Sequence, residues 1–343
     1  MNKQLLLFVT LFVILNGGCK KDPVHDPEIP SHMQEGDVVL VLNEGNFQWG
    51  NSSTTLIKIN SGEVTLNAFE KINDRPLGDV LQSAFRDNQL FLVVNNSQKI
   101  ERMPDAVSKA GIPITGFQSP RFMVKSNHGY FVSDLYANKL YKLSNSLSVE
   151  SSISMAGWGE GMACPDGEHV YVCNMSSGYL MKLDASEGRF TDSVRVGDSP
   201  KSVVVDSQDR IWVLCEGSIY PDETEGSLWC LNASDLTVLF SQNFELGAHP
   251  SNLNIRKLNE DTLYFLKNGV FRMPTSTFET PQAAFIPENG RLFYGLGIDL
   301  QGRVWVSDAK DYVQQGEVYR YNHSGIQEAS YKVGIIPSGF VFY

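Results

Sequence analysis

The chain has 343 residues and a formal net charge of -11, with 42% hydrophobic and 20% charged residues. This composition is that of a globular protein whose core can serve one or two domains, and it excludes a disordered chain. The diffuse acidic balance also argues against a nucleic-acid-binding protein, because phosphate binding needs a basic patch.

The N-terminal segment predicts export. Lys3 supplies a positive charge, residues 5–15 form an apolar run, and small residues precede Cys19. We therefore expect residues 1–18 to be a signal peptide with a lipoprotein cleavage site and Cys19 to carry the lipid. The apolar run is too short for a spanning helix; an ordinary N-terminal anchor, or a signal peptide cut elsewhere, is the alternative.

The segment after Cys19 predicts a flexible tether. Residues 19–36 contain three prolines and mixed charges and cannot bury apolar area. Residues 37–343 are then the folded domain. A lipid-anchored domain on such a tether would face solvent near a membrane.

The folded domain is built from repeats. A hydrophobic, β-rich segment ending in Asn, Asp or Glu recurs about every 40 residues, with two longer intervals, which is typical of propeller blades. An alternating segment follows most of these markers, as expected of half-buried strands, and no stretch shows sustained helical periodicity. The sequence therefore predicts an all-β, seven-bladed β-propeller. The marker segments are 38–43, 90–95, 130–134, 170–174, 211–216, 263–268 and 304–308.

The two ends of the domain predict how the ring closes. The first marker begins at Val38 with no strand before it, whereas residues 336–343 resemble a first strand with nothing after it. We expect this C-terminal strand to complete the first blade, because closure removes the open edges that would promote aggregation. This arrangement of the two ends is not expected for the alternatives, an open solenoid or two sandwiches.

Four cysteines lie in the folded domain, and their spacings match no zinc site. Cys164 could face Cys173 across a hairpin, and Cys215 could face Cys230. An exported protein can hold disulfides. Buried free thiols in strands are the other interpretation.

One face of a propeller gathers the loops that follow the second strands and the loops that precede the first strands. At least six of these loops contain an aromatic residue, which is unusual unless something packs on them. An aromatic cup with a few amides suits a bulky, flat, partly polar ligand; the alternative is that each tyrosine fills a groove between blades. The candidate ligand-binding residues are Phe47, Trp49, Asn95, Arg121, Tyr136, Trp158, Met175, Tyr179, Tyr220, His249, Asn252, Tyr294 and Tyr312.

The polar ends of the marker strands allow a metal-binding interpretation. Such oxygen ligands could hold calcium at the channel mouth and polarise a lactone or ester. Asn and Asp at these positions also cap strands by bonding backbone amides, and we favour that interpretation. The residues concerned are Glu44, Asn95, Asp134, Asn174, Glu216 and Asp308.

Catalytic motifs are missing from the sequence. His249 is the one histidine expected on the loop-rich face, whereas His128, His169 and His323 are expected in turns of the opposite face or the blade periphery. No Gly-x-Ser-x-Gly segment, phosphate loop or dinucleotide fingerprint occurs. We therefore expect ligand capture rather than catalysis, and we assign no catalytic or metal-binding residue.

The segment Leu42-Asn43-Glu44-Gly45-Asn46-Phe47, with Gly50-Asn51-Ser52 after it, and the Val-Tyr-Val-x-Asn pattern of 170–174 resemble the YncE-like propeller lipoproteins of Bacteroidetes. The likeness covers residues 38–343, and its Asn-Glu-Gly-Asn-Phe segment is the more specific part. Within that group the chain is most similar to the BtuG-type corrinoid-binding lipoproteins.

This resemblance implies a lipid-anchored protein of the outer membrane, facing the cell surface. It would capture a corrinoid such as cobalamin, as a ligand rather than a cofactor, and pass it to a TonB-dependent transporter. The resemblance assigns no individual contact. Two other functions stay open: a metal-dependent lactonase-like hydrolase, and an envelope protein-interaction propeller without a small-molecule ligand.

Overall fold

The computed structural model describes residues 36–257 and 260–343. The expected signal peptide, the lipid site at Cys19 and the tether up to residue 35 lie outside these residues, so that division stays a prediction. Within the described part, no helix has both the length and the apolar character that a membrane crossing requires.

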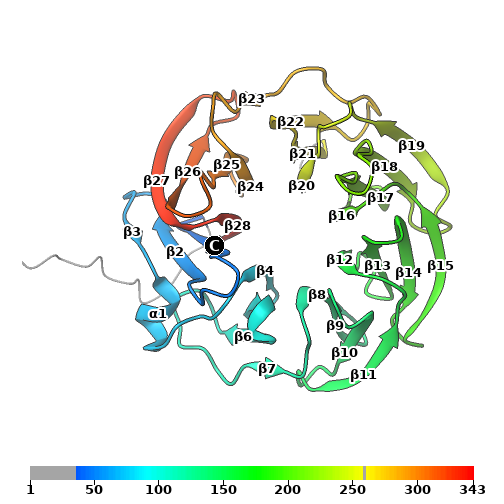
Figure 1. Ribbon diagram of the computed structural model, residues 1–343, viewed down its shortest axis with the longest axis horizontal. Coiled ribbons are helices and arrows are strands. Elements are labelled where there is room, and N and C mark those ends of the chain that lie inside the picture. Colours follow the sequence, from blue (N-terminus) through cyan, green and yellow to red (C-terminus); the bar gives the residue numbers. More distant parts are fainter. Residues whose placement is uncertain (1–35, 258–259) are drawn as a thin grey trace, which may run out of the picture.

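Seven four-stranded antiparallel sheets surround a central opening, which confirms the predicted seven-bladed propeller (Figure 1). Strands are given below from the innermost to the outermost. The first three blades are β28 (Pro337–Phe342), β1 (Val38–Asn43), β2 (Ser53–Lys58) and β3 (Val64–Thr65); β4 (Leu81–Arg86), β5 (Leu90–Val94), β6 (Lys99–Met103) and β7 (Ile114–Thr115); β8 (Pro120–Ser126), β9 (Gly129–Asp134), β10 (Lys139–Leu143) and β11 (Val149–Ser154).

The remaining four blades have the same order. They are β12 (Gly159–Ala163), β13 (His169–Asn174), β14 (Tyr179–Asp184) and β15 (Arg189–Arg195); β16 (Pro200–Val205), β17 (Arg210–Cys215), β18 (Ser227–Asn232) and β19 (Val238–Asn243); β20 (Ser251–Arg256), β21 (Thr262–Leu266), β22 (Gly269–Pro274) and β23 (Ile286–Pro287); β24 (Phe293–Ile298), β25 (Val304–Asp308), β26 (Gln315–Tyr321) and β27 (Gln327–Ile335).

The C-terminal strand closes the ring as predicted. β28 pairs antiparallel with β1, with Phe340 opposite Val41 and Val341 opposite Leu40. The backbone N–H of Tyr343 donates to the Val38 carbonyl at 3.0 Å. The two ends of the folded domain therefore share one sheet, and the ring has no open edge at this seam.

The core lies between the blades. The second strands β1, β5, β9 and β25 are buried along their whole length, because both faces of each blade are covered by neighbours. Their sequences are accordingly mainly apolar, and a polar residue ends each strand or directly follows it. The outermost strands β11, β15 and β19 are mostly exposed.

A repeated Asp-x-x-x-Arg-x-Trp segment, at 206–212 and 299–305, fixes the first hairpin of blades five and seven. Trp212 Nε1–H donates to Asp206 Oδ2 at 2.9 Å, and Arg210 Nε–H donates to the same oxygen at 2.7 Å. The second copy has the same contacts at 2.8 and 2.7 Å. Burial raises the pKa of Asp206, but these hydrogen bonds outweigh burial and leave it below its ordinary value.

The two long intervals of the repeat are insertions. A six-residue helix, α1 (Ala68–Asn73), lies between β3 and β4, and the loop 216–226 separates β17 from β18. Arg75, just after α1, binds the fully buried Glu101 carboxylate of β6 through two hydrogen bonds of 2.8 and 2.7 Å. Another short element, the 3₁₀ helix η1 (Asn95–Ser97), follows β5.

The four cysteines of the domain are free thiols; Cys173, Cys215 and Cys230 are buried in strands, whereas Cys164 is half-buried just after β12. Strand register is the reason in blade five, because Cys215 lies opposite Ser227 and Cys230 lies opposite Trp212. Burial raises the pKa of Cys164 to about 11 and that of Cys230 to about 12.

Candidate functional site: the central cavity and its rim

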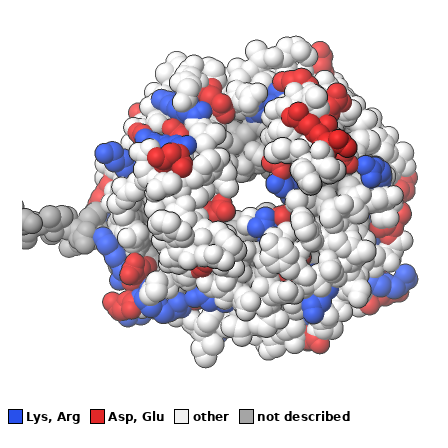
Figure 2. Space-filling model, viewed as in Figure 1, with Lys and Arg blue, Asp and Glu red and all other residues white. Residues whose placement is uncertain are grey.

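The centre of the ring is a cavity of about 790 Å³. This volume lies within the range of about 300–1,000 Å³ that is typical of small-molecule sites. Figure 2 looks into the opening and shows basic and acidic side chains at its edge. The inner strand of every blade contributes to the wall.

A β-bulge near the start of each inner strand turns a polar residue toward this cavity. The pairing between first and second strands shifts in all seven blades, for example between Pro200 and Ser202 and between Leu81 and Ser83. A bulge re-aims the side chain of the extra residue. The result is a ring of seven polar side chains, one from each blade: Gln82, Arg121, Glu160, Lys201, Asn252, Tyr294 and Ser338.

Arg121 is the centre of one charged group in this ring. A guanidinium N–H of Arg121 lies 2.9 Å from Glu160 Oε1, and another donates to the side-chain oxygen of Gln82. The side chain of Glu160 is only 3% exposed and that of Arg121 18% exposed. Together, Gln82, Arg121 and Glu160 therefore join blades two, three and four at the cavity wall.

The other basic side chains of the wall also have acidic partners. The two lysine bridges pair their charges, so neither lysine is a free cation in the cavity. The pairs are Lys201 with Glu216, Lys267 with Glu245 at 2.9 Å, and His249 with Glu223 at 3.3 Å.

Glu44, which follows β1, has no cationic partner among the described residues. Its Oε2 accepts a hydrogen bond of 2.9 Å from the Tyr294 hydroxyl. Burial raises the pKa of Glu44, and the Tyr294 hydrogen bond and the charge of Arg121 offset only part of this effect. The Tyr312 ring meets the Tyr294 ring edge-on, with centroids 5.7 Å apart. A carboxyl group and two tyrosines thus form the corner between blades seven and one.

Two asparagines of β20 extend this corner. Asn252 Nδ2–H donates to the Tyr294 carbonyl at 2.7 Å, and Asn254 Nδ2–H donates to the Leu296 carbonyl at 3.2 Å. Asn252 has a positive φ of 56°, which asparagine tolerates better than most residues. Because the amide nitrogens are used on the backbone, both carbonyl oxygens are held in the cavity wall.

The polar ends of the marker strands mostly cap turns, in agreement with the interpretation favoured from the sequence. Asp134 accepts hydrogen bonds from the backbone N–H groups of Ser119 and Ala137 at 2.7 and 2.9 Å. Asn95 and Asn174 donate to neighbouring backbone carbonyls, and Asp308 accepts backbone N–H groups. Glu44 and Glu216 are the two members of the set that line the cavity.

No three His, Cys, Asp or Glu side chains are grouped so that they could hold a metal ion within residues 36–257 and 260–343.

The structure divides the candidate ligand-binding residues into two groups. Five of them line the cavity: Arg121, His249, Asn252, Tyr294 and Tyr312. The rest lie outside its wall. Asn95 is buried against Ser119, Met175 is half-buried, and the exposed aromatic residues are Phe47, Trp49, Tyr136, Trp158, Tyr179 and Tyr220.

The aromatic residues of the 44–52 loop are exposed although the loop is well anchored. Phe47 is 60% and Trp49 73% exposed. The backbone N–H of Gln48 donates to both oxygens of the Asp79 carboxylate, at 3.1 and 2.9 Å. Asn46 Nδ2–H donates to the Tyr312 carbonyl at 2.6 Å, which ties the loop to blade seven. Both rings are thus presented to solvent from a fixed backbone.

A second exposed aromatic group joins blades three and four. Tyr136 and Trp158 meet edge-on, with ring centroids 6.4 Å apart. The backbone N–H of Trp158 donates to Ser176 Oγ at 3.0 Å, and the N–H of Met175 donates to the Trp158 carbonyl at 2.9 Å. Tyr220, in the 216–226 insertion, is 86% exposed.

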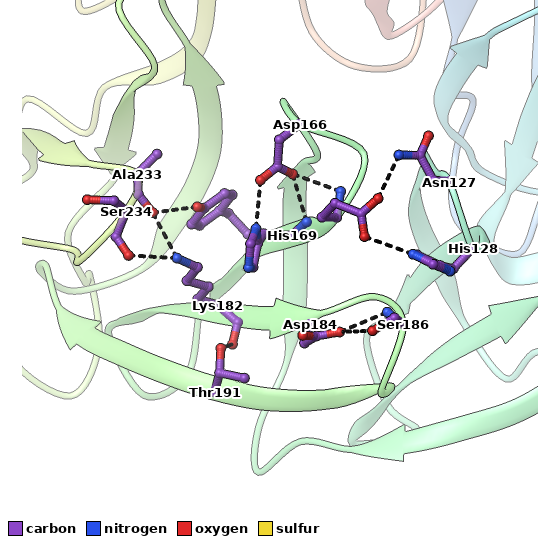
Figure 3. A network of polar contacts seen from close by, with 12 residues as sticks. Asn127, His128, Asp166, His169, Lys182, Asp184, Ser186, Thr191, Ala233 and Ser234 are labelled. Atoms are coloured by element: carbon purple, nitrogen blue, oxygen red, sulfur yellow. Dashed lines mark hydrogen bonds and ion pairs between the residues drawn. The ribbon is translucent and has the colours of Figure 1, made fainter.

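The three histidines expected away from the channel, His128, His169 and His323, do not line the central cavity. His128 lies in the β8–β9 turn and His169 at the start of β13, and each is paired with a carboxylate (Figure 3). His128 Nε2 lies 2.8 Å from Glu168 Oε2, and His169 Nδ1 lies 2.6 Å from Asp166 Oδ2. The His128–Glu168 contact joins blades three and four, whereas the His169–Asp166 contact lies within blade four. Among the described residues, His249 is the histidine that lines the cavity.

Sequence reasoning missed most of the polar ring. Gln82, Glu160, Lys201 and Ser338 were not among the candidate residues, and neither was Asn254. Their common signal is position: each ring residue directly follows the first residue of an inner strand. That signal becomes useful only once the strand starts and bulges are known.

In comparisons with known proteins, this chain is similar to others in fold alone. No protein-family model matches the sequence, and no curated protein matches it. The virginiamycin B lyase of Staphylococcus aureus is similar in structure, with a TM-score of 0.60 and 14% identity over 76% of this chain and 87% of the lyase.

Two further solved structures share the architecture. A candidate 6-phosphogluconolactonase of Bacteroides fragilis has a TM-score of 0.61 and 12% identity over 90% of this chain and 98% of its own. The dihydro-heme d1 dehydrogenase NirN has a TM-score of 0.58 and 11% identity over 92% of this chain and 77% of its own. At these identities the likeness is one of fold, and the chain is a seven-bladed propeller whose structural neighbours have varied functions.

Proposed function

We propose that this protein captures a bulky small-molecule ligand on the loop-rich face of the propeller, and that the ligand is a corrinoid such as cobalamin. The observation that carries the proposal is the set of exposed aromatic side chains that lie at or near the loops between second and third strands or just before an inner strand. Large rings held in solvent by a fixed backbone gain much free energy when a flat ligand covers them, and they lose little conformational entropy.

The cavity supports a ligand that is both large and polar. Its wall combines the polar ring with apolar residues such as Met162, Val203 and Phe340. A corrin macrocycle is flat and carries amide side chains at its edge, so its face suits the aromatic rim and its edge suits the polar wall. NirN, solved in complex with DHE, is a structural neighbour of this chain; that complex concerns NirN alone, and it motivates the choice of a large planar ligand.

The resemblance described above extends the proposal to transport. In this account the lipid on Cys19 anchors the propeller to the outer membrane at the cell surface, and a TonB-dependent transporter receives the ligand. Co-purification from membranes with such a transporter, and release of the protein by a lipoprotein-specific lipase, are the expected results.

Calorimetric titration of the purified protein with cyanocobalamin tests the binding step. We expect a Kd below about 1 µM, which corresponds to about -8 kcal/mol. Trp158→Ala should weaken binding roughly tenfold, since an aromatic contact contributes about 0.5–1.5 kcal/mol beyond its area. The matched control is Phe190→Ala, which removes an aromatic side chain from the outer strand β15 and should leave the affinity unchanged. An absence of heat with the wild-type protein would refute corrinoid capture.

Glu44 favours a second candidate function, a lactonase-like hydrolase. A carboxyl group whose pKa is raised by burial and which accepts a tyrosine hydrogen bond could act as a general acid or base. Lactone hydrolysis by the wild-type protein, with and without added calcium, and its loss in Glu44→Gln would support this alternative over capture.

A further inference from the structure

The wall formed by blades six, seven and one has hydrogen-bond acceptors without donors. Glu44 Oε1 and the Oδ1 atoms of Asn252 and Asn254 accept no hydrogen bond from the residues that the structure describes, and all three residues line the cavity. The other polar side-chain atoms of these residues already have hydrogen-bond partners within the protein. The Tyr294 hydroxyl donates to Glu44 Oε2, and the two asparagines donate to backbone carbonyls.

These acceptors form one connected unit. Asn252 is bonded to the Tyr294 backbone, and the Tyr294 hydroxyl is bonded to Glu44, so the three residues hold one another in place. Asn254 is bonded to the carbonyl of Asn252 at 3.1 Å and to that of Leu296 at 3.2 Å. The amide nitrogens cannot rotate toward the cavity without losing these bonds, so the oxygens stay toward it.

The opposite part of the wall differs. There the charged groups satisfy one another, as Arg121 does with Glu160 and Lys201 with Glu216. A ligand in the cavity therefore meets unsatisfied acceptors on one side and internally paired charges on the other. Leaving such acceptors without a donor is unfavourable when the ligand excludes water, because each acceptor then loses its hydrogen bond to solvent.

We infer that the wall of Glu44, Asn252 and Asn254 selects ligands by their N–H donors, and that peripheral primary carboxamides of the ligand are the groups it binds. This inference rests on the proposed function and specifies which part of the ligand the cavity recognises. The Tyr312 ring, packed on Tyr294, covers the same corner and gives the bound amide an apolar neighbour.

Two corrinoids that differ in their edge groups test the inference. Dicyanocobinamide carries primary amides, whereas dicyanocobyrinic acid heptamethyl ester has the same macrocycle with methyl esters, which lack N–H donors. Calorimetric titration should show cobinamide binding at least 30-fold tighter. Glu44→Gln and, separately, Asn254→Ala should reduce this ratio by roughly tenfold, about 1.4 kcal/mol, and they should leave the affinity for the ester nearly unchanged.

Glu187→Gln is the matched control, because Glu187 is an exposed residue outside the cavity that pairs with Arg189; it should preserve the ratio. Thermal melts check that each variant is folded. A third probe, spermine, distinguishes carboxamide donors from ammonium donors.

The possible outcomes distinguish donor selection by the cavity wall from corrinoid capture as such. Equal affinity for cobinamide and the ester would overturn donor selection and leave corrinoid capture standing. Binding of spermine alone, weakened in Glu44→Gln, would keep the selection of N–H donors but replace the carboxamide with an ammonium group and refute the corrinoid. No binding of any probe would overturn both.

Discussion

The Arg121–Glu160 pair supports a quantitative prediction, because it joins the fold to the cavity wall. Arg121 is the ion-pair partner of Glu160 within the described residues, and the Glu160 side chain is 3% exposed. Replacing Arg121 with Leu leaves a buried carboxylate without its cation. Breaking a buried pair from one side costs about 3–5 kcal/mol. We therefore expect Arg121→Leu to lose at least about 3 kcal/mol of unfolding free energy at pH 7.

A double-mutant cycle separates the pair from the other contacts of each residue. Urea unfolding at pH 7 would be measured for Arg121→Leu, Glu160→Gln and the double variant. We expect the double variant to be more stable than Arg121→Leu alone, because no charge is left unpaired, with a coupling free energy of about 2 kcal/mol. A coupling near zero, or a single variant within about 0.5 kcal/mol of the wild type, would refute the interpretation of this pair as a buried, interdependent unit.

Three further predictions concern named groups. Because the folded-state pKa of Glu44 is raised above its ordinary 4.5, the charge of Glu44 destabilises the fold as pH rises above that value. Glu44→Gln should therefore be more stable than the wild type at pH 8 and equal to it at pH 4. A difference in denaturant midpoint that stays the same across this range would contradict the assignment. Asp299→Ala removes the hydrogen-bond acceptor of Trp305 and Arg303, and it should lower the free energy of unfolding by about 3 kcal/mol. A melting temperature within about 2 °C of the wild type, which corresponds to a loss on the order of 1 kcal/mol or less, would show that the motif contributes little. Burial raises the pKa of Cys215 to about 12, so iodoacetamide at pH 8 should label this thiol only after urea is added. Rapid labelling of Cys215 in the native protein would instead show that blade five opens readily.

Much of the fold could be predicted from the sequence because each blade repeats one strong pattern. The second strands are mainly apolar, since neighbouring blades cover both faces. A polar residue lies at or near the end of each, and several of these residues cap a turn, as Asp134 does. The missing first strand before Val38 and the extra strand at 336–343 identified the seam that β28 and β1 form. The loop aromatics followed from the same topology.

The polar ring could not be predicted in full, because it depends on register. A bulge of one or two residues decides whether Lys201 or its neighbour turns toward the cavity, and a shift of one residue exchanges the two faces of a strand. The pairing of the cysteines stayed undecided for the same reason, since Cys230 turned out to lie opposite Trp212. The helix α1 is too short to produce a periodic signal. By contrast, the Asp-x-x-x-Arg-x-Trp repeat at 206–212 and 299–305 is visible in the sequence itself.

The most direct test of the account is the position of the ligand. Crystals of the protein soaked with cyanocobalamin, measured at the cobalt absorption edge, would locate the metal of the corrin ring from its anomalous signal. We expect one cobalt peak over the central cavity, within reach of Arg121, Tyr294 and Tyr312, with the ring covered by the aromatic rim. A peak on the outer strands or the opposite face, or a saturated soak with no peak at the cavity, would contradict the proposal that this propeller captures a corrinoid in its central cavity.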